Sequence, residues 1–168
     1  ELEEIGYHTM TGISRSIYVS GPYAYIVNSY ASLYIIDVSD PSAPVETGVF
    51  SIDNSPYGVY VSEEIAYLAC YDYGFIIVDV SYPYLPTGLG LYPLEDHSYN
   101  VQVIDTIAYV AASFTGLRLI NVADPTDPEE IGFYDTGDVC YDVYVVDNLA
   151  FVADRLYGLR IIDVTDPT

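Results

Sequence analysis

The sequence repeats itself every 42 residues, and this repeat constrains the fold more than any other feature. The segment LYIIDVSDPSAP at residues 33–44 returns as FIIVDVSYPYLP at 75–86 and as LRLINVADPTDP at 117–128. A shorter copy, LRIIDVTDPT, occupies residues 159–168. A period of about 20–50 residues is typical of solenoids and propellers, because one repeat cannot bury its apolar face alone and needs stacked neighbours.

Each repeat has the residue pattern of four short β-strands. In the first repeat Ile17 and Val19 alternate with serine and tyrosine, and a pair of valines takes their place in every later repeat. Such alternation predicts a half-buried strand. Further strands are predicted at residues 24–28, 33–38 and 45–50. The segment 33–38 is almost continuously apolar, so we expect neighbouring elements to cover both of its faces.

A turn built on aspartate and proline follows this third strand. Asp40, Asp124 and Asp166 each precede a proline, and Tyr82 replaces the aspartate in the second repeat. The aspartate can accept hydrogen bonds from nearby backbone amides while proline restricts φ, so the chain must turn here. Four strands per repeat and no helical periodicity predict an all-β fold, a β-propeller with four four-stranded blades per chain. We expect one domain over residues 1–168, with repeats at approximately 9–50, 51–92, 93–134 and 135–168 plus 1–8.

The first residues of the chain match the fourth strand of a repeat. The segment EEIGY at 3–7 corresponds to EEIGF at 129–133, whereas the last repeat stops before its own fourth strand. Leu2 to His8 is therefore predicted to complete the last blade. It can do so in its own four-bladed ring, by reciprocal pairing with a second chain in an eight-bladed ring, or head to tail in a polymer. The sequence does not choose among the three.

The third-strand motif resembles the LVIVD-repeat family, a group of β-propeller proteins. It occurs here as LYIID, FIIVD, LRLIN and LRIID, each followed by a turn of the DVSDP type, and Asn121 departs from the expected aspartate. The resemblance covers the whole chain. It implies an extracellular or cell-surface setting and a binding or scaffold role, and it supplies no catalytic residues.

The charge of the chain excludes several kinds of partner. It contains 25 aspartates and glutamates against four basic residues, all arginine, and its net charge is −21. Such a surface repels phosphate backbones and anionic lipid, so we expect no binding to nucleic acid. No stretch of about 18 apolar residues occurs, so we also expect no membrane insertion.

The two cysteines, Cys70 and Cys140, occupy different positions of the repeat. Two cysteines cannot build a disulfide framework. We expect them to be free, buried thiols that act as small apolar side chains.

The candidate binding residues lie in loops that should share one rim. In an up-and-down blade the loop after the second strand and the loop between blades fall on the same side, and these loops differ most between repeats. Tyrosine offers a large contact area with a polar end, which suits ligand binding. The predicted binding residues are Tyr30, Tyr57, Asp72, Tyr73, His97, Tyr99, Phe114, Tyr141, Asp142 and Arg155. The same rim should also carry Asp53, Asn54, Tyr71, Asp96, Asp138 and Tyr157.

Neither a metal site nor a catalytic site is predicted. The histidines occupy different repeat positions, and no zinc-binding spacing is present. Asp135, Asp138, Tyr141 and Asp142 could offer oxygen ligands for Ca²⁺, but no EF-hand loop pattern supports such a site. No nucleophile elbow or phosphate-binding loop occurs, so we expect no enzyme and no cofactor. The expected function is a non-catalytic binding or scaffold module for a protein or glycan. The alternative is a self-assembling subunit of a surface layer or extracellular filament, whose partners are further copies of itself.

Overall fold

The computed structural model describes residues 1–30 and 32–166, which form fifteen β-strands in four antiparallel sheets and no helix. The first sheet consists of β1 (Ser14–Ser20), β2 (Tyr23–Asn28), β3 (Ser32–Asp37) and β4 (Val45–Ser51). The second consists of β5 (Gly58–Ser62), β6 (Ile65–Cys70), β7 (Gly74–Asp79) and β8 (Thr87–Tyr92). The third consists of β9 (Asn100–Ile104), β10 (Ile107–Ala111), β11 (Leu117–Asn121) and β12 (Glu129–Tyr134). The last consists of β13 (Cys140–Val146), β14 (Leu149–Asp154) and β15 (Gly158–Asp163).

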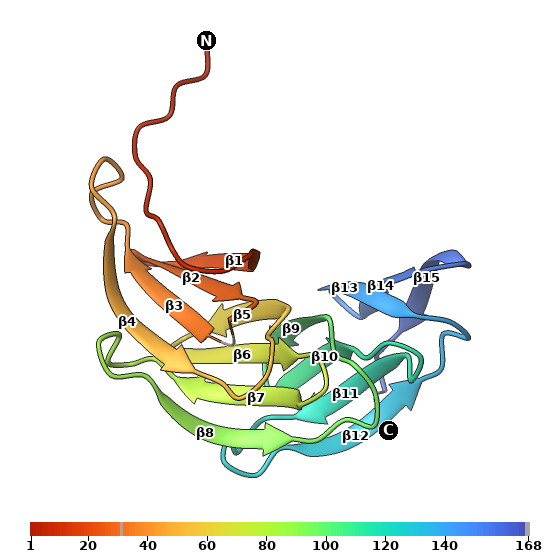
Figure 1. Ribbon diagram of the computed structural model, residues 1–168. Coiled ribbons are helices and arrows are strands. Elements are labelled where there is room, and N and C mark those ends of the chain that lie inside the picture. Colours follow the sequence, from red (N-terminus) through yellow and green to blue (C-terminus); the bar gives the residue numbers. More distant parts are fainter. Residues whose placement is uncertain (31, 167–168) are drawn as a thin grey trace.

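The four sheets stand side by side in an arc, as the blades of a propeller do (Figure 1). The strands β1, β5, β9 and β13 lie on the inside of the arc, and β4, β8 and β12 lie on the outside. Each sheet is an up-and-down meander, because consecutive strands are neighbours and all pairs are antiparallel. The predicted all-β fold with four repeated blades is therefore confirmed, whereas the described residues form an arc and not a closed ring.

The hydrophobic core lies in the seams between neighbouring sheets. At the first seam Val27, Leu33 and Ile35 of the first sheet pack with Val59 and Val61 of the second. Residues at the same repeat positions build the other two seams: Phe75, Ile77, Val101 and Val103 at the second, and Leu117, Leu119, Val143 and Val145 at the third. The repeat thus encodes one interface that is used three times.

The predicted turn after the third strand is confirmed where it is described. Asp40 Oδ1 accepts hydrogen bonds from the backbone N–H of Ser42 at 3.0 Å and from its hydroxyl at 2.7 Å. Asp124 and Thr126 repeat this arrangement at 2.9 and 2.7 Å. The bonds from Ser42, the side chain first and then the backbone, lower the pKa of Asp40. The fourth turn extends into residues 167–168, which lie outside the described residues.

The two ends of the arc expose apolar faces that are buried at every seam. Leu159 is 63% exposed, whereas Leu117, one repeat earlier, is fully buried. Ile17 is 61% exposed, whereas Val59, one repeat later, is 4% exposed. We call the side of the first sheet that carries Ile17 and Val19 the leading face, and the side of the last sheet that carries Leu159 and Ile161 the trailing face. The expectation that the third strand is covered on both faces is therefore wrong for β15 in the described residues, because none of the other three sheets packs against its trailing face.

The N-terminal segment does not complete the last blade within this chain. Residues 1–10 contain no strand, and the last sheet has three strands in the described part of the chain. Figure 1 shows the segment leaving the first sheet and running away from β13, β14 and β15. The predicted fourth strand is absent from the last sheet because the first and last sheets lie at opposite ends of the arc.

Both cysteines are free and buried, as predicted. No helix of the described residues is long and apolar enough to cross a membrane.

Candidate functional site

The two kinds of loop predicted to share a rim do meet. The β6–β7 loop and the loop between the second and third blades are joined by a bridge in which the N–H of Ser98 donates to the carbonyl oxygen of Tyr71 at 3.1 Å. The Ser98 hydroxyl donates to the carbonyl oxygen of Gly74 at 2.7 Å. One blade further on, the N–H of Phe114 donates to Asp96 Oδ2 at 2.9 Å. These bonds hold the rim loops of neighbouring blades together, so side chains from different blades can form one surface.

Four residues at one repeat position line this rim, and we call them the aromatic row: Arg15, Tyr57, Tyr99 and Tyr141. Each stands at the start of the inner strand of its blade. The guanidinium of Arg15 lies 3.8 Å from the centroid of the Tyr57 ring. The rings of Tyr57 and Tyr99 are 5.5 Å apart edge to face, and those of Tyr99 and Tyr141 are 5.0 Å apart. Such spacings are typical of favourable ring pairs, so the row is a continuous contact chain across all four blades.

A stacked tyrosine and histidine support the middle of the row. Tyr71 stacks on Tyr57 with ring centroids 5.0 Å apart, and His97 stacks on Tyr71 at 3.7 Å with the two planes 9° apart. His97 Nε2 lies 2.7 Å from Asp72 Oδ1, and its Nδ1 lies 3.5 Å from Asp96 Oδ1. The two carboxylates hold the imidazole in place over Tyr71, so this part of the rim is ordered before any ligand arrives.

The central tyrosine of the row has a raised pKa. Burial is the largest cause of the raised pKa of Tyr99, and the neighbouring phenols of Tyr71 and Tyr141 raise it further. Tyr141, at the end of the row, is 44% exposed.

The other predicted residues divide into two groups. Asp142 accepts a hydrogen bond from the Asn100 side chain beside the row. Arg155 forms an ion pair with the buried Asp138 at 2.8 Å and lies over the Phe114 ring at 5.6 Å, so its main contacts are internal. Tyr30 is exposed in the first blade and donates its N–H to Asn28. The structure thus brings together Tyr57, Asp72, His97, Tyr99, Tyr141 and Asp142, whereas Tyr30, Tyr73, Phe114 and Arg155 lie outside the row.

Sequence reasoning did not select Arg15 as a binding residue. The signal was present, because Arg15 stands 42 residues before Tyr57 and so belongs to the same column of the repeat. The predicted binding residues are mainly tyrosines and acidic residues in loops, whereas Arg15 lies inside β1.

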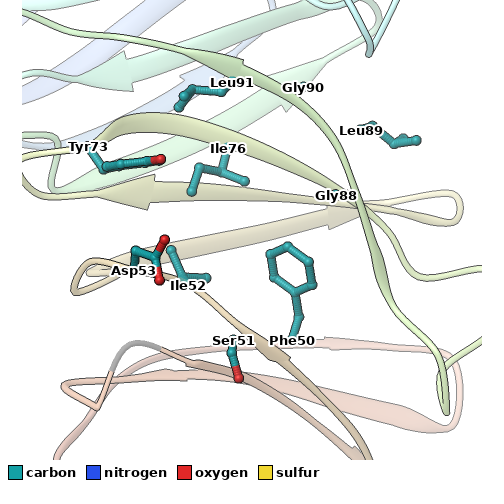
Figure 2. A pocket seen from close by; sticks show the side chains of 10 residues that line it. All are labelled: Phe50, Ser51, Ile52, Asp53, Tyr73, Ile76, Gly88, Leu89, Gly90 and Leu91. Carbon is teal, nitrogen blue, oxygen red and sulfur yellow. The ribbon is translucent and has the colours of Figure 1, made fainter.

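Tyr73 lies in a separate cleft of about 370 Å³ between the outer strands of the first and second blades (Figure 2). Figure 2 shows Asp53 and Tyr73 toward one end of this cleft and the Phe50 ring toward the other. Arg118 and Glu130 occupy the same repeat positions in the third blade as Ile76 and Gly88 in the second. Arg118 and Glu130 form an ion pair at 3.1 Å, and the cleft between the second and third blades has a volume of only about 180 Å³. Ile76 and Gly88 form no such pair, so the cleft between the first and second blades is wider. The lining residues are Phe50, Ser51, Ile52, Asp53, Tyr73, Ile76, Gly88, Leu89, Gly90 and Leu91.

Acidic side chains are not gathered for metal binding in residues 1–30 and 32–166, where no group of three or more His, Cys, Asp or Glu is placed to hold an ion. Asp138, one of the carboxylates considered for Ca²⁺, instead forms an ion pair with Arg155.

Solved structures share this fold at low sequence identity. The computationally designed Ika4 protein matches with a TM-score of 0.80 and 7% identity, over 98% of this chain and 99% of that chain. The computationally designed Ika8 protein matches with a TM-score of 0.77 and 8% identity, over 92% of this chain and 47% of that chain. BamB from Moraxella catarrhalis matches with a TM-score of 0.76 and 12% identity, over 96% of this chain and 50% of that chain. The chain therefore spans about half the length of the Ika8 and BamB chains, and at these identities the likeness shows the fold alone.

The sequence comparisons agree with the repeat. A search of curated proteins returned no match. The LVIVD repeat matches at residues 11–51, 57–92, 97–136 and 137–168. Because these four matches cover most of the sequence and coincide with the four sheets, the chain belongs to the LVIVD-repeat family.

Proposed function

We propose that this protein is a non-catalytic binding module, working outside the cell or at its surface, that captures a basic protein segment on its aromatic row. The observation that supports this proposal is the contact chain from Arg15 through Tyr57 and Tyr99 to Tyr141, with ring contacts of 5.0 to 5.5 Å. Aromatic side chains that are already ordered bind with little loss of conformational entropy.

The chain itself displays the contact that such a ligand would make. The guanidinium of Arg15 lies over the ring of Tyr57, and Tyr141, at the equivalent repeat position, is 44% exposed. A guanidinium from a partner can stack on Tyr141 in the same way. The exposed carboxylates of Asp72 and Asp142 stand nearby and favour a positive charge.

The overall charge favours a basic protein segment over a glycan. A net charge of −21 attracts basic partners over long range and speeds their association, whereas it gives no advantage to a neutral sugar. A protein segment that carries arginine combines this attraction with the aromatic contact. A neutral glycan would use the aromatic contact alone.

A direct test measures binding of a fluorescent peptide of alternating arginine and glycine, with cellohexaose as the glycan probe. Tyr141→Ala should weaken peptide binding about fivefold or more, since contact tyrosines at binding surfaces commonly contribute about 1 kcal/mol or more. Tyr82→Ala is the matched control, because Tyr82 is 63% exposed but lies in the β7–β8 turn on the opposite rim. Equal peptide binding by both variants, or binding of the glycan alone, would refute the proposal.

The second candidate function is a self-assembling structural subunit, which requires that the exposed leading and trailing faces pack in an open filament and not in a closed ring. In an open filament the trailing face of each chain would cover the leading face of the next. Light scattering without added ligand would then show a particle mass that rises steadily with protein concentration.

A further inference from the structure

We infer that a second copy of this chain completes the propeller: the trailing face of each chain covers the leading face of the other, and each N-terminal segment supplies the missing outer strand of its partner. The result is a closed ring of eight blades with two identical seams. This inference does not depend on the aromatic row or on any ligand.

The two faces fit one another because the protein already builds the same seam three times. At the first seam, Leu33 and Ile35 pack with Val59 and Val61. On the trailing face, Leu159 and Ile161 occupy the repeat positions of Leu33 and Ile35. On the leading face, Ile17 and Val19 occupy the repeat positions of Val59 and Val61. Docking the last blade of one chain on the first blade of another would therefore reproduce an interface whose residue types and strand positions occur inside the chain.

The N-terminal segment already lies where the outer strand of a preceding blade would lie. A Cβ built on Gly6 would be 3.1 Å from the carbonyl carbon of Pro41 and 3.2 Å from Cα of Ser42. A Cβ built on Gly48, in the outer strand β4, would likewise be 3.1 Å from the carbonyl carbon of Pro83 and 3.2 Å from Cα of Tyr84 in the next blade. The segment is therefore placed on the first blade as β4 is placed on the second.

A second pair of contacts follows the same rule. His8 Nε2 lies 3.9 Å from the carboxylate of Glu46 in β4. One repeat later, a Cβ on Gly88 in β8 would lie 3.3 Å from the ring of Phe50. Residues 8 and 50 thus face the outer strand of the next blade in the same manner. The N-terminal segment has the position of an outer strand but no sheet beside it.

The last sheet has the complementary gap. In the described residues β15 pairs with β14 on one edge, and no strand covers the other. The outer pairs of the first three sheets join Leu33 with Phe50, Phe75 with Tyr92, and Leu117 with Tyr134. The same register predicts that Leu159 of one chain pairs with His8 of the other. An exposed apolar edge favours such pairing.

Residues 1–168 expose both faces at the same time, and a second copy offers a matching face to each of them. Two arcs related by a two-fold axis leave no face uncovered, because each supplies one leading and one trailing face. The match to about half of the Ika8 chain is consistent with an arc that forms half of a larger fold. A second copy is the partner that carries both required faces and an N-terminal segment of its own.

The first test is the particle mass measured by size-exclusion chromatography with light scattering. We expect twice the chain mass of 18.6 kDa, independent of concentration over a hundredfold range above the dissociation constant. A particle of one chain at all concentrations would overturn the inference. A mass that grows without limit would also overturn it, since that result requires an open polymer.

Complementation between damaged faces tests which surfaces meet. Ile17→Asp places a charge on the apolar leading face, and Ile161→Asp places one on the apolar trailing face. Each variant alone should remain a single chain, because both seams of its dimer would bury an unpaired charge. Mixed together they should recover two-chain particles, because the pair retains one intact seam. Leu85→Asp is the control, since Leu85 is 65% exposed but lies in the β7–β8 turn, and it should remain a dimer. Failure of the mixture to pair would count against the proposed docking.

A cross-link tests the strand exchange. A His8→Cys and Leu159→Cys double variant should form a disulfide between chains on mild oxidation and run as a covalent dimer on a non-reducing gel. The native cysteines are buried, and each single variant serves as the control for their reaction. A disulfide within one chain would show a four-bladed ring, and no disulfide would show that the segment pairs elsewhere. Either result would overturn the inference.

Discussion

The same substitution at two equivalent positions should have very different effects on stability. Leu117 and Leu159 occupy one position of the repeat, in β11 and β15, and both begin an LR-containing strand motif. Leu117 is fully buried in the third seam, whereas Leu159 is 63% exposed on the trailing face. Leu117→Ala and Leu159→Ala therefore change the same atoms in two different environments.

The expected difference follows from burial. Leu117→Ala removes a fully buried side chain and leaves a cavity between two sheets, which should lower the free energy of unfolding by about 3 kcal/mol. Leu159 buries only about a third of its surface and its loss leaves no enclosed cavity, so Leu159→Ala should cost about 0.5–1 kcal/mol in a single chain. The difference of about 2 kcal/mol is well above the error of a denaturation experiment.

The comparison is best made by urea unfolding followed by far-ultraviolet circular dichroism. Both variants should carry Ile17→Asp, which prevents a partner from covering the trailing face, and should be compared with the Ile17→Asp chain alone. The midpoint should fall much further for Leu117→Ala than for Leu159→Ala, with similar slopes. Equal midpoint shifts would refute the reasoning, because they would mean that Leu159 is buried within its own chain.

Three further predictions test other parts of the fold. Gly116→Ala should lower the melting temperature more than Gly158→Ala: both glycines have φ near +80°, but only at Gly116 would a Cβ collide with the backbone of a neighbouring outer strand. Ellman's reagent at pH 8 should label neither cysteine in the native protein and both after unfolding, because burial raises the pKa of Cys140 to about 12 and also raises that of Cys70. Hydrogen bonds from the side chain and backbone of Thr126 lower the pKa of Asp124 in the folded protein. The ionised Asp124 therefore stabilises the fold at pH values above its unfolded pKa of about 4, and this stabilisation is lost as the pH falls through its lower folded pKa. Asp124→Asn should therefore reduce the acid dependence of the melting temperature measured between about pH 5 and 2, and an unchanged dependence would contradict this assignment.

Much of the candidate site could be predicted from the sequence, because loop parity is a consequence of strand order. Once each repeat has four up-and-down strands, the loops that carry Tyr57, Asp72, His97, Tyr99 and Tyr141 must fall on one rim. The particular contacts could not be predicted in this way. The stacking of His97 on Tyr71 and of Arg15 on Tyr57 depends on the distance and twist between blades, which the spacing of residues along one chain does not specify.

The sequence by itself determined the local structure: the strands, their alternating faces, the aspartate–proline turn and the number of blades. These features depend on contacts within one repeat or between identical neighbours, so a periodic sequence contains them in full. Only the tertiary structure decided which of the equivalent residues are buried. Leu117 and Leu159 have nearly the same neighbours in sequence, but one faces another blade and the other faces the open end of the arc. Burial depends on what lies across the seam, and no blade of the described residues lies across from Leu159.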